Sequence, residues 1–189
     1  MRIIEDLNIP ANIGRPCAVT IGSFDGVHKG HQSLITKMRN LVGDQGVTCL
    51  VTFKNHPSHV LPNWTAVELI LETTEKLKWL EHYGVDAVYC IPFTLELAAM
   101  DYKTFIKKLF LACPFDHLVL GKDAHLGNRR GGTPQRVSEL CTSLGACAHY
   151  LSKITTGDKD ISSSHIRSLL TNQLTDKAEE LLGHPLKAD

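Results

Sequence analysis

Short apolar runs alternate with helical patterns along most of the chain. The apolar runs predict strands at residues 17–22, 47–53, 86–91, 117–121 and 147–151. Apolar positions spaced three and four apart predict helices between them, at residues 31–42, 74–82, 102–112 and 134–144. The run Ala87-Val88-Tyr89-Cys90-Ile91 is apolar at every position, which is typical of a parallel strand covered on both faces. The alternation therefore predicts an α/β fold with a doubly wound parallel sheet.

The pattern changes after residue 151. Two more helices are predicted at residues 161–171 and 176–182, with no strand after them. The residues that fit helix-start caps are Asp101, Thr133 and Thr175, and the glycines that fit helix ends are Gly84, Gly145 and Gly183. The longest loop-like stretches are residues 55–65 and 152–160. The C-terminal helices therefore stand apart from the repeated strand-and-helix units.

The turn between the first predicted strand and helix, residues 22–31, carries the clearest candidate chemistry. Its glycines let the backbone take positive φ and let a ligand come close, and the helix start that follows attracts phosphate. His28 and His31 are three residues apart, so one helical turn places both imidazoles on one side, and Gly30 leaves room for a phosphate chain. Because imidazole donates hydrogen bonds to phosphoryl oxygens, the turn fits attack on an α-phosphate with loss of diphosphate.

Composition narrows the class of protein. The 189 residues are 43% apolar and 21% charged, as in an ordinary globular protein, and residues 1–189 are expected to form a single domain. Lysine and arginine together number 20, as do aspartate and glutamate, which argues against a general nucleic-acid binder. No apolar run reaches membrane-span length and the N-terminus lacks the layout of a signal peptide, so we expect a cytoplasmic protein with no membrane partner.

Cysteines and histidines do not predict a metal site. The six cysteines include no CxxC pair, and those in apolar runs are expected to be reduced core residues. Zinc on Asp25, His28 and His31 would need a further ligand, and neither an HExxH motif nor a cysteine partner supports it. We therefore predict no protein-bound metal.

Three segments carry a resemblance to a known family. Residues 19–32, with the string GSFDGVHKGHQ, resemble the opening motif of the bacterial FAD synthetases, which are the FMN adenylyltransferase modules of bifunctional riboflavin kinase/FAD synthetase proteins. Residues 161–167 are similar to the family's ISSTxIR motif, with Ser164 where threonine is usual, and residues 178–185 resemble its closing A-x-x-L-L-G-R-P. The resemblance covers residues 17–185 and implies the Rossmann-like fold of the HxGH nucleotidylyltransferases.

The resemblance implies transfer of AMP from ATP to FMN, giving FAD and diphosphate, with Mg²⁺ arriving on the ATP. No protein nucleophile is needed for this reaction, because the FMN phosphate attacks the α-phosphorus in line. The catalytic residues that it implies are His28, His31 and Arg167. The ATP-binding residues that it implies are Gly22, Ser23, Phe24, Asp25, Gly30, Ser163 and Ser164.

Two further segments are similar to the family's flavin-pocket motifs. Residues 51–57, VTFKNHP, resemble VTFxPHP, with Asn55 in place of the first proline, and residues 121–132 resemble GxDFRFGxxRxGD. The flavin-binding residues that the resemblance implies are Phe53, His56, Pro57, Asp123, Leu126 and Arg130. Ala124 and Leu126 stand where the family has phenylalanines, whose rings would orient a flavin by stacking.

Two other functions stay open at this point. An HxGH adenylyltransferase of the same fold could take another acceptor, such as phosphopantetheine or nicotinamide mononucleotide. The second possible function is that of a module that binds nucleotide or flavin without catalysing a reaction. The presence of His28, His31, Ser163 and Arg167 argues against this function. The family's riboflavin kinase module should begin just after Pro185, where only residues 186–189 remain, so we expect no kinase domain in this chain. A longer native protein that carries this module at its C-terminus stays open.

Overall fold

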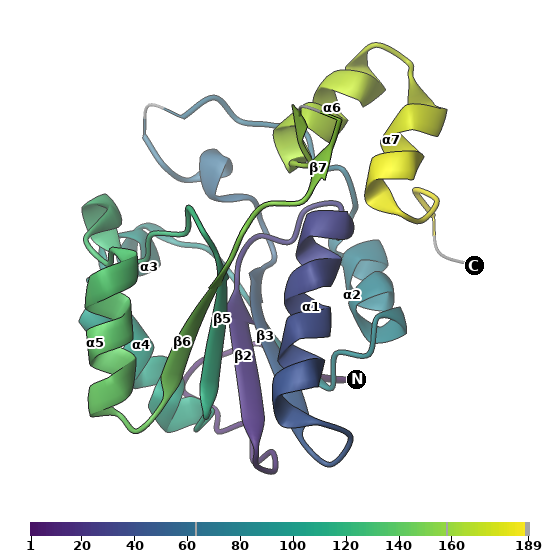
Figure 1. Cartoon of the computed structure of the whole chain (residues 1–189). Helices are drawn as coiled ribbons and strands as arrows, with labels where there is room; N and C mark the ends of the chain where they lie inside the picture. The colour runs from purple at the N-terminus through teal and green to yellow at the C-terminus, as the bar shows by residue number, and fades with distance from the viewer. Residues whose placement is uncertain (63, 158, 188–189) are drawn as a thin grey trace.

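The computed structural model describes residues 1–62, 64–157 and 159–187. Within these residues the chain builds a six-stranded sheet of order β1-β4-β3-β2-β5-β6, in which every neighbouring pair is parallel (Figure 1). The strands are β1 Arg2–Ile4, β2 Cys17–Ile21, β3 Val47–Phe53, β4 Ala87–Ile91, β5 His117–Gly121 and β6 Cys147–Leu151. A small hairpin of β7 Thr155–Thr156 and β8 Lys159–Asp160 stands outside the sheet.

Helices cover both faces of the sheet (Figure 1). They are α1 Lys29–Val42, α2 Thr73–His82, α3 Leu95–Ala99, α4 Tyr102–Ala112, α5 Pro134–Ser143, α6 Ser163–Thr171 and α7 Thr175–Leu182, with short 3₁₀ helices η1 Pro57–His59 and η2 Asn128–Arg130. The core on one face joins α4 and α5, and the core on the other joins α1, α2, α6 and α7. The chain is therefore a three-layer α/β fold, as the alternation predicts.

Strand β4 explains why the central strands read as continuous apolar runs. Val88 and Cys90 face the α1 and α2 side, whereas Ala87, Tyr89 and Ile91 pack toward α4 and α5. All five residues are buried because both faces of the sheet are covered. No helix in the described residues is long and apolar enough to cross a membrane.

The predicted strands and helices are confirmed to within two residues at their ends, and Asp101 and Thr133 cap α4 and α5. One cap prediction is wrong. Thr175 is already the first residue of α7; Leu174 occupies the cap position, and no side-chain cap hydrogen bond forms there. The sequence also missed β1, since a three-residue edge strand held by pairing with β4 leaves no periodic pattern.

All six strands point the same way, so their carboxyl ends meet at one edge of the sheet. The segments that leave this edge include the turn into α1, the loop that holds η1 and the loop that holds η2. Helices α6 and α7 lie above this edge, close to the start of α1 (Figure 1). Ligands of doubly wound sheets bind at such an edge, so we expect the functional site among these three segments.

Two tyrosines in the sheet differ in the hydrogen bonds of their hydroxyl groups. The Tyr89 hydroxyl donates toward two carbonyl oxygens, Ile9 O at 2.8 Å and Ala112 O at 3.0 Å. The Tyr150 hydroxyl is buried without a hydrogen-bond partner in the described part of the chain. We expect Tyr89→Phe to lower the free energy of unfolding by about 1–2 kcal/mol, because Ile9 O loses its donor, whereas Ala112 O still accepts from the Ala11 N–H at 2.7 Å.

Tyr150→Phe is the matched control, and we expect it to change the free energy of unfolding by less than about 0.5 kcal/mol, since no hydrogen bond is lost. Urea unfolding at pH 7 measures both variants. Equal losses in the two variants would contradict the hydrogen-bond assignment.

Candidate active site

The turn between β2 and α1 has an unusual backbone. Phe24 and Val27 take positive φ angles of 50° and 40°, and Gly26 lies between them at 86°. A left-handed conformation is costly for a β-branched residue such as Val27. Both side chains are buried, so core packing holds the turn in this shape. A Cβ at Gly26 would lie 3.0 Å from Leu182 of α7, which leaves no room for a larger residue.

His28 and His31 stack on each other at the start of α1. Their ring centroids are 3.7 Å apart with an interplanar angle of 17°, and the Phe24 ring lies 4.6 Å from that of His31. His28 is the N-cap of α1, and its Nδ1 accepts a hydrogen bond from the His31 N–H at 3.4 Å. The remaining ring nitrogen, Nε2, therefore carries the proton of a neutral His28 and is a donor. A Cβ at Gly30 would sit 3.1 Å from the His28 ring, so glycine permits this approach.

Both imidazoles are neutral near pH 7. Burial lowers the pKa of His28 to about 4, and nearby His184 acts in the same direction. Burial also holds the pKa of His31 well below its ordinary value, with the neighbouring His28 and Lys76 adding to the effect. His31 Nδ1 is buried without a hydrogen-bond partner among the described residues. The pair thus offers uncharged N–H donors at a helix N-terminus, where anions bind.

Asp25 ties the turn to two distant segments. Its Oδ1 accepts from the backbone N–H groups of Ile70 at 2.9 Å and Leu71 at 3.3 Å, and its Oδ2 pairs with Arg167 Nη2 at 2.5 Å. The Ser163 hydroxyl donates to the Asp25 carbonyl at 2.8 Å. The start of α6 is therefore held against the turn, so the two histidines and the Ser/Arg segment do come together, as the sequence predicts.

A cavity of about 240 Å³ opens beside the histidines. Its lining includes most of the turn residues that the resemblance assigns to ATP and catalysis: Gly22, Ser23, Phe24, His28, Gly30 and His31. Leu151 at the end of β6, residues 152–154 and Ile161 also line it. Asp25, Ser163, Ser164 and Arg167 are not part of this lining. Asp25 is 3% exposed and its carboxylate contacts protein groups, whereas Ser164 is exposed at the start of α6.

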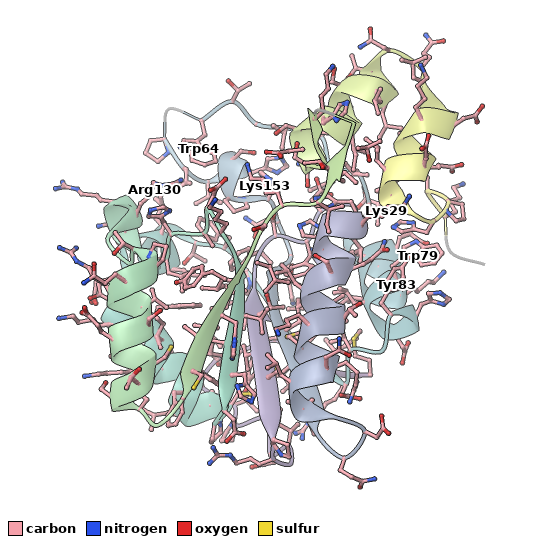
Figure 2. The ribbon with its side chains drawn as sticks, in the orientation of Figure 1. Lys29, Trp64, Trp79, Tyr83, Arg130 and Lys153 are labelled. Carbon is pink, nitrogen blue, oxygen red and sulfur yellow. The ribbon has the colours of Figure 1, made fainter. Side chains whose placement is uncertain are left out.

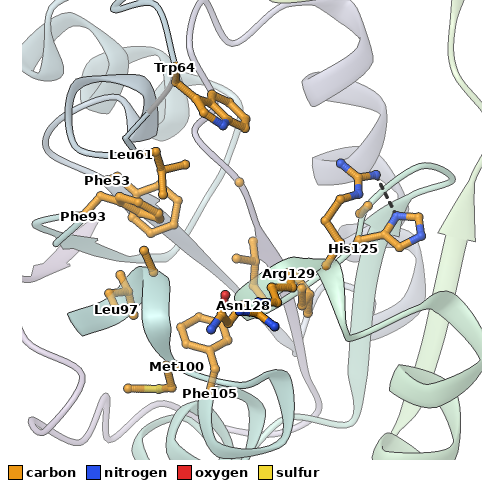
Figure 3. A pocket seen from close by; sticks show the side chains of 17 residues that line it. Phe53, Leu61, Trp64, Phe93, Leu97, Met100, Phe105, His125, Asn128 and Arg129 are labelled. Atoms are coloured by element: carbon orange, nitrogen blue, oxygen red, sulfur yellow. Dashed lines mark hydrogen bonds between the residues drawn. The ribbon is translucent and has the colours of Figure 1, made fainter. Parts of the chain in front are cut away.

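A larger cavity of about 620 Å³, whose lining side chains are drawn in Figure 3, shares Gly22 with the smaller one. Its walls are mostly apolar and aromatic, and they include Phe53, Phe93, Phe105, Trp64 and Leu61. Phe53 and Phe93 meet edge to face, with ring centroids 5.0 Å apart. Both cavities are lined by Ile21 and Gly22, so they meet at the carboxyl end of β2.

Only some of the predicted flavin-binding residues line the larger cavity. Phe53, Leu126 and Arg130 line the larger cavity. Asp123 lies outside the lining and pairs with Lys153 Nζ at 2.7 Å.

His56 and Pro57 also lie outside the larger cavity, at the start of η1. His56 Nδ1 lies 2.8 Å from the Ser58 hydroxyl, and the His56 side chain borders a narrow crevice of about 10 Å³. The structure therefore gives His56 a local turn contact and leaves its role toward a ligand as a prediction.

Aromatic residues that sequence reasoning did not assign to the site complete the wall. Trp64 is 60% exposed and lines the cavity from the loop after η1, and Figure 2 shows it above the carboxyl edge of the sheet. Phe93 follows β4 and is held by Asn55, whose amide accepts from Phe93 N at 2.8 Å and donates to Phe93 O at 3.0 Å. Ala124 lines the same cavity. Ala124 thus shares the lining of this cavity with rings from other loops.

Comparisons with known proteins agree with this geometry. The family model described as FAD synthetase matches residues 11–165. A bifunctional riboflavin kinase/FMN adenylyltransferase of Bacillus subtilis is 34% identical over 169 residues, which are 88% of this chain and 53% of that protein. An FAD synthetase of Listeria monocytogenes is 29% identical over 177 residues, 93% of this chain and 72% of that protein. The chain spans about half the length of the Bacillus relative.

A solved structure extends the likeness to the whole fold. The crystal structure of a Streptococcus pneumoniae protein named macrolide-efflux protein superposes with a TM-score of 0.83 at 25% identity, covering 97% of this chain and 60% of that one. That score supports the sheet order and the C-terminal helices described above. With the family match spanning most of its length, the chain belongs to the FAD synthetase family.

Proposed function

We propose that this chain transfers the AMP group of ATP to the phosphate of FMN, producing FAD and diphosphate. The observation that carries the proposal is the meeting of the two cavities at Gly22, with the neutral histidine pair beside the junction. A nucleotide in the smaller cavity and a flavin in the larger one would present their phosphates to each other there. Holding two reactants in this way makes the reaction effectively unimolecular.

The reaction needs position and charge stabilisation more than a protein nucleophile. An oxygen of the FMN phosphate forms the new bond to the α-phosphorus of ATP, and the bond from that phosphorus to the α,β-bridging oxygen breaks. Diphosphate leaves with the electron pair. The Nε2–H of His28 would donate to an α-phosphoryl oxygen as charge builds up on it, and His31 would support the leaving diphosphate.

The rest of the triphosphate would extend toward the start of α6. Ser164 is exposed there, and Arg167 is held close by its pairing with Asp25. Among the described residues, no group of three or more histidine, cysteine, aspartate or glutamate side chains could hold a metal ion. Mg²⁺ would instead be bound by phosphate oxygens and water and would neutralise part of the phosphate charge.

The larger cavity favours a flavin over the other acceptors of this fold. Phe53, Phe93 and Trp64 offer flat apolar surfaces to a fused ring, and such surfaces orient an aromatic ligand as well as bury it. Phosphopantetheine has no ring to meet them, and nicotinamide has a single small one. A riboflavin kinase, on the same or another chain, is the activity that would supply the FMN.

Incubation with ATP, Mg²⁺ and FMN, followed by chromatographic separation of flavins, tests this function. We expect FAD and diphosphate in equal amounts, and no adenylylated product when phosphopantetheine or nicotinamide mononucleotide replaces FMN. Flavin binding without FAD formation would contradict catalysis. Product formation with one of the other two acceptors would contradict the substrate.

Replacing His28 tests the role of the imidazole. We expect His28→Ala to lower kcat by about 100- to 1000-fold, as loss of a donor to a developing oxyanion does, with ATP binding changed less than about threefold. Steady-state kinetics and a direct ATP-binding measurement separate the two effects. His82→Ala, on the exposed part of α2, is the control and should leave both values unchanged. An unchanged kcat in His28→Ala would remove the assigned role.

The depressed pKa of His28 predicts an acid sensitivity of the ligand-free protein. The unfolded chain takes up this proton at its ordinary pKa of 6.5, whereas the folded chain does so only near about 4. Protons therefore favour the unfolded state between these values, so stability is full above pH 6.5 and is lost as the pH falls. At pH 5 the loss from His28 is about 2 kcal/mol relative to pH 7.

His28→Gln removes the titrating group while keeping a similar size. Urea unfolding at pH 7 and pH 5 should show a smaller acid loss for this variant than for the unmodified protein. The same loss in both proteins would mean that His28 does not titrate as assigned.

A further inference from the structure

Lys76 of α2 is a buried cation directly behind the turn. It is 6% exposed, and its Nζ donates to three oxygens: Phe53 O at 2.7 Å, Thr52 Oγ1 at 3.2 Å and Ser23 O at 3.3 Å. None of the described carboxylates forms an ion pair with it. A buried charge without an ion pair is costly unless its donors are satisfied. Packing alone therefore does not explain a lysine at this position.

The three acceptors call for the charged form of the side chain. The Thr52 hydroxyl donates its own proton to Ser23 O at 2.8 Å, so toward Lys76 it can only accept. The other two acceptors are carbonyl oxygens, which never donate. Three acceptors match the three donors of an ammonium group, whereas a neutral amine has only two. Burial lowers the pKa of Lys76, and the nearby Asp25 carboxylate opposes that shift.

The contacts of Lys76 join the walls of the two cavities. Ser23 lines the cavity beside the histidines, and Phe53 lines the aromatic cavity. Ser23 follows the end of β2, where the sheet ladder no longer holds it, and Phe53 is the last residue of β3, which still pairs with Ile91 of β4. Lys76 also borders the narrow crevice between these segments. One ammonium therefore joins Ser23 of one cavity wall to Phe53 of the other.

We propose that Lys76 is a positioning residue for adenylyl transfer: by holding the carbonyls of Ser23 and Phe53, it sets how the acceptor phosphate approaches the nucleotide. This inference rests on the proposed function. Lys76 borders neither of the two larger cavities and acts through Ser23 and Phe53. A small displacement of one wall relative to the other would leave each substrate bound and would slow the transfer between them.

Kinetics of three variants test this role. We expect Lys76→Met to lower kcat by about 10- to 100-fold with both KM values changed less than about threefold, because misplacement by about 1 Å costs this much. Lys76→Arg restores the charge and the donors, and we expect at least about fivefold more kcat than in Lys76→Met. Lys78→Met is the matched control, since Lys78 lies on the same helix with its side chain 54% exposed, and it should behave as the unmodified protein.

Thr52→Val keeps the test decisive if Lys76→Met folds poorly. This variant keeps the ammonium and removes one acceptor together with the Thr52–Ser23 bond. We expect a kcat loss of about three- to tenfold, again with both KM values nearly unchanged. Thermal unfolding of each variant fixes the temperature at which all of them are folded for the assays.

The outcomes separate this inference from the proposed function. If the unmodified protein makes FAD and both Lys76→Met and Thr52→Val keep its kcat, the positioning role is wrong and the function stands. A rise in the KM values with kcat unchanged, or no recovery in Lys76→Arg, also overturns the role. If the unmodified protein makes no FAD, the proposed function fails and the role of Lys76 fails with it.

Discussion

The Asp25 carboxylate is the contact on which the site depends. It accepts hydrogen bonds from the backbone of residues 70 and 71 and pairs with Arg167, so it joins three segments that are far apart in the sequence. The turn that it holds contains Phe24 and Val27 at positive φ, a shape that an isolated chain would not keep. This side chain therefore links the turn before α1 to α6, together with the Ser163 hydroxyl, which donates to the Asp25 carbonyl. The histidines and the Ser/Arg segment share an edge of the sheet through these contacts.

Two neutral imidazoles inside this frame match the chemistry of the family. A charged histidine would already bind phosphate strongly in the ground state, whereas a neutral N–H donor stabilises charge that develops on the reacting group without that tight ground-state binding. Burial keeps the His28 pKa low, and the Gly30 position lets the helix backbone come within reach of the ring. The aromatic cavity shares Ile21 and Gly22 with the cavity beside the histidines, so in the proposed reaction the two substrates would present their phosphates to each other at the end of β2.

Much of this arrangement could be predicted from the sequence, because local signals and the fold agree. The run around Val88 is apolar at every position, and Cys49, Leu50 and Val51 form the apolar centre of β3, since helices cover both faces of the sheet. The Gly22–His31 turn stands where a strand gives way to a helix, and the parallel topology brings it beside the later loops.

What could not be predicted depends on contacts across the fold. The family resemblance implies that Asp25 binds ATP. In the structure its carboxylate contacts Arg167 and two backbone amides. Asn55, which stands where the family has proline, holds Phe93 through both ends of its amide. Trp64 enters the cavity wall from a loop without periodicity. The local sequence does not predict such contacts, because they form only when distant strand ends come together.

A crystal structure with FMN and a non-hydrolysable ATP analogue bound together would show whether the two substrates meet beside the histidine pair. We expect the flavin ring against Phe53 and Phe93, the triphosphate beside His28, and the FMN phosphate near Gly22 within about 3.5 Å of the α-phosphorus. A flavin outside the aromatic cavity, or a triphosphate away from the histidine pair, would contradict this expectation.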